Sequence, residues 1–220
     1  MATDNVKIAG KELKQVDLGV ALENPSFSVY GNRKAYDGVM GFAKNKKFPT
    51  PAEALFKHGL TAHPITIFRL SRLTDGLNDG KITFGHLDPY SIDVKTLVTF
   101  KNVGEDGLWE GHFTAASVGG KRLELAGGRT AIFDTAFAGI GVPRGDIAAI
   151  AAGNPGWSTD NGDIIIPCTN TAVLSLTFND VNFDTQPIDL LHAPVDIHKP
   201  KDKCTSSITE TDAVPPGKWM

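Results

Sequence analysis

The sequence lacks the features that mark highly charged, membrane-spanning or signal-bearing chains. Its formal net charge over 220 residues is only −3, which argues against a strongly basic or acidic binding surface. No apolar run approaches the roughly 18 residues of a membrane-spanning helix. Residues 1–5 are polar and contain no apolar signal core. We therefore expect no nucleic-acid or membrane partner, and we expect any secretion signal to lie outside this sequence.

Common catalytic and cofactor signatures are also missing. The Gly-x-Ser-x-Gly elbow of serine hydrolases does not occur. Paired glycines at 119–120 and 127–128 lie in predicted hairpins and not between a strand and a helix, which argues against a phosphate-binding loop. The six histidines show no metal-ligand spacing, and His192 and His198 flank a proline-containing loop. The sequence predicts no metal and no cofactor.

Cysteine is scarce, with only Cys168 and Cys204 in the whole sequence. A disulfide between them would stabilise the fold by about 2–4 kcal/mol, mainly by restricting the unfolded chain. Two buried free thiols are equally compatible with two cysteines at this spacing. The residues alone leave both possibilities open.

What the sequence has is the composition of an ordinary globular protein, 41% hydrophobic and 21% charged, with mostly strand-like segments. Three strands predicted at 112–118, 122–125 and 130–134 are separated by the two glycine pairs, which indicates an antiparallel meander. The fold class is therefore predicted to be all-β, mainly antiparallel, with short helices. Further strands are expected at 6–8, 15–21, 81–85, 97–100, 163–167, 173–178 and 181–183.

Helical signals are few. Residues 51–58 follow an early proline and end before a glycine, and residues 145–152 form a short apolar run after Pro143. Residues 193–218 contain four prolines and many charges, which predicts loops.

One strand ends in an acidic residue, in the order Ile132-Phe133-Asp134-Thr135-Ala136. By itself this is a weak signal, because an aspartate in a turn at a strand end is common. Its surroundings strengthen the signal, since several further segments occur in a fixed order around it. These are Asp-Gly-Val-Met-Gly-Phe-Ala at 37–43, Asp-Gly-Lys-Ile-Thr-Phe-Gly at 79–85, Leu-Trp at 108–109, Gly-Val-Pro at 141–143 and Ile-Pro-Cys at 166–168.

In this order and spacing the segments resemble the pepsin-like aspartic proteases over nearly the whole chain. The resemblance implies a pepsin-like acid-protease lobe at residues 46–220. Residues 1–45 would be a remnant of the amino-terminal lobe and inter-lobe strands. It also implies that Cys168 and Cys204 form a disulfide.

The resemblance further implies roles for the residues around the acidic turn. Asp134 would be the second catalytic aspartate, sharing a proton with a partner aspartate to activate water. Thr135 and Ala136 would brace the turn, and Ile132, Phe137 and Ile140 would line the substrate or ligand cleft. The expected substrate is a peptide or protein, and the expected location is secreted or vacuolar.

The sequence departs from the family pattern around the acid. It contains no Asp-Thr-Gly turn for the first aspartate, and after Met220 the family would continue with Leu-Gly-Asp and further strands. Ala136 replaces a glycine, adding a methyl group that disfavours positive φ. Phe137 and Ala138 replace hydroxyl-bearing residues. We therefore expect little or no peptide hydrolysis by this chain alone.

Three alternatives remain open at this stage. A complementary chain or a homodimer could supply the second aspartate. The chain could be a pseudoprotease that binds a peptide or a small apolar ligand in the old cleft. It could also be a recruited pepsin-like lobe that catalyses a different reaction.

Overall fold

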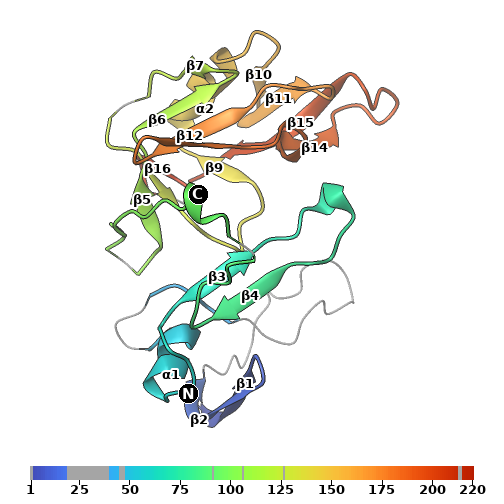
Figure 1. Cartoon of the computed structure of the whole chain (residues 1–220). Coiled ribbons are helices and arrows are strands. Elements are labelled where there is room, and N and C mark those ends of the chain that lie inside the picture. Colours follow the sequence, from blue (N-terminus) through green and yellow to red (C-terminus); the bar gives the residue numbers. More distant parts are fainter. Residues whose placement is uncertain are drawn as a thin grey trace. The chain divides into compact units, whose positions relative to one another are not determined.

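The computed structural model describes residues 2–18, 40–44, 48–90, 92–105, 107–125, 127–212 and 215–220. Most regular structure in these residues is β-strand, with two short α-helices, so the predicted fold class is confirmed. The chain divides into two compact units (Figure 1). Unit 1 comprises Met1–Leu73 and Leu77–Val94, and unit 2 comprises Thr74–Gly76 and Lys95–Met220. These two compact units do not coincide with the lobes predicted from the sequence, whose boundary at residues 45–46 stays a prediction.

The described residues of unit 1 form two hairpins and one α-helix. Strands β1 (Ala2–Ile8) and β2 (Lys11–Leu18) pair antiparallel, as do β3 (Thr66–Arg69) and β4 (Lys81–Phe84). The predicted helix at 51–58 is α1 (Pro51–Lys57). It begins with a capping box, in which Thr50 and Glu53 each accept a hydrogen bond from the other's backbone N–H. The part of the predicted strand 15–21 beyond Leu18 lies outside the described residues, as do residues 37–39 of the motif at 37–43.

The described residues of unit 2 form three sheets, and most of their strands are labelled in Figure 1. The first has the order β10 (Ser158–Asp160), β11 (Asp163–Pro167), β15 (Lys203–Glu210) and β14 (Leu191–Pro194), with β9 (Ile140–Val142) parallel to β15. The second has the order β13 (Val181–Asp184), β12 (Leu174–Phe178), β6 (Ala115–Val118) and β7 (Lys121–Arg122). The third has the order β16 (Lys218–Trp219), β8 (Thr130–Ile132) and β5 (Glu110–His112).

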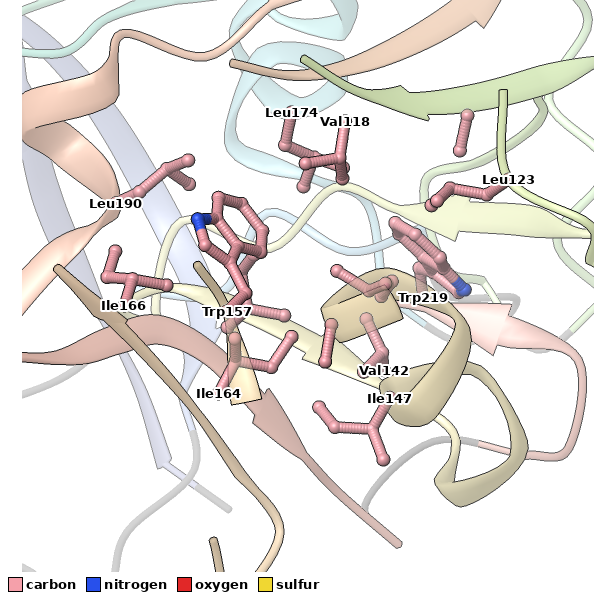
Figure 2. Close-up of a cluster of buried hydrophobic side chains, with 14 of the residues drawn as sticks. Val118, Leu123, Val142, Ile147, Trp157, Ile164, Ile166, Leu174, Leu190 and Trp219 are labelled. Atoms are coloured by element: carbon pink, nitrogen blue, oxygen red, sulfur yellow. The ribbon is translucent and has the colours of Figure 1, made fainter. Parts of the chain in front are cut away.

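The core of unit 2 lies where these sheets meet helix α2 (Arg144–Ala152). Figure 2 shows its side chains gathered around Trp157 and Trp219, with Val118 and Leu174 contributed by the second sheet. Ile150, Ile164, Ile166 and Ile208 have no exposed surface. Complete burial of such side chains stabilises a fold by about 1.5–3 kcal/mol each, so this cluster supplies the main hydrophobic stabilisation of the unit.

Several local expectations are wrong because tertiary pairing divides the sequence differently. The single strand expected at 112–118 is two strands: β5 pairs with β8, and β6 pairs with β12 in another sheet. The chain changes sheets at Phe113 and Thr114, so the segments around the glycine pairs do not form one meander. The strand expected at 122–125 contributes only β7, which ends at Arg122, and residues 97–100 form no strand.

Residues 193–218 were expected to be loops, yet they contain β15, an eight-residue strand in the middle of the first sheet. Strand β14 precedes it directly in the sequence, but its other partners β11 and β9 are distant, so local composition gave no indication of its central place in the sheet. At the start of this strand Cys204 forms a disulfide with Cys168, with 5.0 Å between their Cα atoms. The disulfide implied by the family resemblance is therefore confirmed.

Candidate active site

The candidate acid follows directly from strand β8. This strand lies between β5 and β16. It is antiparallel to β5, where Glu110 stands opposite Ile132, and parallel to β16, where Trp219 stands opposite Ala131. The backbone N–H of Phe133 donates to the carbonyl of Trp109 at 2.8 Å and continues the pairing for one more residue. Asp134 thus leaves the sheet from a strand fixed on both sides.

A short turn holds the carboxylate of Asp134. The backbone N–H of Ala136 donates to Asp134 Oδ1 at 2.8 Å, and the N–H of Phe137 approaches the Asp134 carbonyl at 3.4 Å. Asp134, Thr135 and Ala136 are exposed. In the described part of the chain, neither a second carboxylate nor a cation is paired with Asp134, so the acid is open to solvent.

Ala136 fits the turn without backbone strain. It is not among the non-glycine residues of the described chain that have a positive φ. The turn therefore does not need the conformational freedom of glycine here, and the difficulty expected from the missing glycine does not arise in the backbone.

Beyond the turn the backbone approaches its neighbours closely. Gly139 has φ +113°, and a Cβ there would lie 2.5 Å from the Ser207 carbonyl oxygen. A Cβ on Gly141 would lie 2.7 Å from Thr211 Cγ2 and 3.1 Å from Phe137 Cζ. The Phe137 ring therefore lies over Gly141, and both glycines are needed for the chain to return into the sheet.

An apolar pocket of about 340 Å³ adjoins the strands that lead into and out of the turn. Ile132 and Ile140, two of the three predicted cleft residues, line it, whereas Phe137 does not. Aromatic rings dominate another wall, where Phe100 and Phe178 stack with centroids 5.3 Å apart. The other lining residues are Ala131, Phe133, Gly139, Leu174, Leu176, Phe183, Asp184, Thr185, Trp219 and Met220.

Two buried carboxylates hold strand β16 beside β8. Asp146 is 2% exposed and accepts two hydrogen bonds from Arg129, at 2.6 and 2.8 Å, and one from Trp219 Nε1 at 2.8 Å. Glu110 is 4% exposed and accepts hydrogen bonds from Thr130 Oγ1 at 2.5 Å and Lys218 Nζ at 2.8 Å. Met220 completes the anchoring through reciprocal backbone hydrogen bonds with Gly141.

The environment of Glu110 shifts its pKa. Burial raises the pKa, but the hydrogen bonds from Lys218 and Thr130 and the nearby charges of Lys218 and His112 outweigh burial, so that the pKa lies below its ordinary value. Glu110 therefore stays ionised in mildly acidic solution.

Sequence reasoning located the turn but missed these anchors. Asp146 interrupts an otherwise apolar helical run, and such a residue signals a buried, paired acid. Its partners Arg129 and Trp219, however, are 17 and 73 residues away. Among the described residues no group of His, Cys, Asp and Glu has the arrangement of a metal site. None of the described helices has the length and apolarity needed to cross a membrane.

Comparison with known proteins gives a consistent picture. Residues 1–217 match the family model of eukaryotic aspartyl proteases. A probable aspartic-type endopeptidase CTSD of Trichophyton verrucosum is 27% identical over 224 residues, which cover 100% of this chain and 42% of that protein. Napsin-A of Mus musculus is 29% identical over 182 residues, covering 79% of this chain and 42% of that protein. The chain thus spans less than half the length of these relatives.

Proposed function

The chain belongs to the eukaryotic aspartyl protease family, and on that premise we propose that it forms part of a pepsin-like aspartic endopeptidase with Asp134 as the second catalytic aspartate. The observation that carries this proposal is the turn after β8. It presents an exposed carboxylate at a strand end and fixes one of its oxygens with the N–H of Ala136. Such a group can take a proton from water or give one to a substrate.

Peptide hydrolysis in this scheme needs two carboxylates that share one proton. The ionised carboxyl removes a proton from water, whose oxygen bonds to the scissile carbonyl carbon, while the protonated one donates to the carbonyl oxygen. Collapse of the resulting diol breaks the C–N bond, and the amine leaves with a proton. Asp134 supplies one carboxylate. We propose that a complementary chain supplies the other, so that the chain alone does not hydrolyse peptides. Inhibitor-sensitive cleavage by the chain alone would instead assign the second carboxylate to a second copy.

The same family membership supports a peptide or protein as the substrate and a secreted or vacuolar location. Both are proposals for the whole enzyme, because this chain spans less than half the length of the Trichophyton and mouse relatives.

A second function is favoured by the apolar pocket of about 340 Å³ beside the turn. In this function the chain is a pseudoprotease that binds a peptide or a small apolar ligand without hydrolysing it. Phe137 supports this function, because a phenyl ring cannot supply the hydroxyl that the family pattern places there.

Acid-pH digestion of a denatured protein separates the two functions. The chain would be assayed alone and mixed with an amino-terminal lobe of a pepsin-like protease chosen because it carries an Asp-Thr-Gly turn, with and without a statine-type inhibitor. The first function predicts inhibitor-sensitive cleavage only in the mixture. This cleavage disappears with Asp134→Asn and persists with Asp160→Asn, a matched change at another exposed strand aspartate. Cleavage that survives Asp134→Asn, or a mixture without any cleavage, would refute it.

A further inference from the structure

Strand β13 (Val181–Asp184) forms one edge of the second sheet of unit 2, and all four of its residues are exposed. We propose that this edge binds an extended peptide strand that is apolar on the face toward the pocket and basic on the opposite face. This develops the peptide-binding function proposed above and does not depend on hydrolysis.

The hairpin register determines which backbone groups of β13 are free. Asn179 and Asp180 form the two-residue turn, both with positive φ (46° and 64°), and Val181 pairs with Phe178 beside it. Hydrogen-bonded pairs alternate from such a turn, and the N–H of Thr185 donates to the Leu174 carbonyl at 2.9 Å, as this alternation requires. The N–H and C=O groups of Asn182 and Asp184 therefore point away from β12.

These outward groups are a template for another strand. In the described part of the chain no strand pairs with the outer edge of β13. An added strand would bond to Asn182 and Asp184 and complete the ladder, the mode of peptide recognition called β-augmentation. A lipid or another small apolar molecule cannot make these backbone bonds, so the free edge favours a peptide as the occupant.

The two faces of β13 differ in chemistry. Phe183 and Val181 stand opposite Leu176 and Phe178 and share one face of the hairpin. Of these four residues, Phe183, Leu176 and Phe178 line the apolar pocket. Phe183 and Val181 remain 44% and 41% exposed, although the Phe183 ring lies 5.8 Å from that of Phe178. Alternate side chains of an added strand would extend this face and cover the exposed aromatic surface.

The other face carries an unpaired charge. Asp184 stands opposite Ser175, so its side chain alternates with that of Phe183, although Asp184 is also among the residues that line the pocket. No residue in the described ranges forms an ion pair or a side-chain hydrogen bond with its carboxylate. A residue directly across from Asp184 on an added strand would have its Cβ about 4.5–5.5 Å away. Lys or Arg at that position would pair with the carboxylate, whereas Asp or Glu would be repelled.

Fluorescence anisotropy tests the proposal with two labelled, end-blocked hexapeptides, Lys-Val-Lys-Phe-Lys-Val and Glu-Val-Glu-Phe-Glu-Val. The protein is the full chain carrying Asp134→Asn, so hydrolysis cannot affect the result and the two proposals fail independently. We expect the lysine peptide to bind up to about tenfold more tightly, because a lysine across from Asp184 is attracted to its carboxylate whereas a glutamate there is repelled. Backbone N-methylation of the lysine peptide should weaken binding about tenfold or more, because the edge hydrogen bonds are lost.

Two variants complete the test, each checked for an unchanged unfolding transition. Asp184→Lys should reverse the preference between the peptides, whereas Asp160→Lys, on a different edge strand, should leave it unchanged. Phe183→Ala should weaken both peptides. Equal binding of the two peptides, or an undiminished affinity of the N-methylated peptide, would overturn the proposal. The latter result would mean that the pocket takes apolar groups without strand addition. The proposal would also be overturned if the chain bound neither peptide and instead self-associated, and if the Asp184→Lys variant self-associated equally.

Discussion

Three carboxylates around the sheet β16-β8-β5 have the same chemistry and opposite environments. Asp146 and Glu110 are buried, and each is bonded to two side chains from other segments. Asp134 leaves the same sheet by one short turn and is exposed, with a single backbone N–H on its carboxylate. A buried acid that is fully paired is costly to alter, whereas an exposed one is available for proton transfer. We infer that Asp146 and Glu110 stabilise the sheet and that Asp134 is available for proton transfer.

The largest effect is expected at Asp146. The change Asp146→Asn keeps the shape but removes the charge that pairs with Arg129, whose side chain is only 16% exposed. Leaving one member of a buried ion pair without its partner costs about 3–5 kcal/mol. Urea denaturation should show that loss in the free energy of unfolding. A loss no greater than that of an exposed Asp→Asn change would mean that Asp146 does not hold β16 in place.

A smaller loss is expected at Glu110. Glu110→Gln removes the charge that accepts from Lys218, and hydrogen bonds to charged groups contribute about 1.5–3 kcal/mol. The same denaturation experiment measures it, with Lys218→Met as a partner variant. Both variants break the same interaction, the contact between Lys218 and Glu110. The double variant should therefore lose less free energy of unfolding than the sum of the two single losses. Strict additivity would contradict the pairing.

The lowered pKa of Glu110 makes part of the stability depend on pH. A carboxyl whose folded-state pKa is depressed stabilises the fold above its unfolded pKa, about 4.3 for Glu, and this contribution is lost as pH falls through the folded pKa. Thermal unfolding between pH 6 and pH 3 should therefore show a decline that is shallower in Glu110→Gln. Parallel curves for the two proteins would contradict the direction of the shift.

The smallest effect on stability is expected at Asp134. Because this carboxylate is exposed, Asp134→Asn should change the free energy of unfolding by no more than about 0.5 kcal/mol. The variant is the matched control for Asp146→Asn, since both make the same chemical change beside the sheet β16-β8-β5. A loss above 2 kcal/mol would assign Asp134 to the structure and weaken the contrast with Asp146.

The sequence predicts these two kinds of carboxylate unequally. Asp134 was predicted as the catalytic acid from the strand-end turn together with the ordered segments around it, from residues 37–43 to 166–168. Asp146 is missed because its partners Arg129 and Trp219 lie 17 and 73 residues away in the sequence. The same reason explains the fold errors, since β15 takes its place through distant partners and the strand at 112–118 divides where the chain enters a second sheet. Turns such as Gly119-Gly120, with φ of +55° and +80°, were predicted correctly because they depend only on neighbouring residues.

The most direct test of the central claim is the rate of inhibitor-sensitive peptide cleavage at acidic pH by the chain assembled with an Asp-Thr-Gly-bearing lobe. The Asp134→Asn substitution should leave the unfolding transition of the assembled protein unchanged. It should lower the cleavage rate by about a hundredfold or more, as expected for loss of a proton-transferring group. A folded, assembled variant that retains the full rate would contradict the assignment of Asp134 to catalysis.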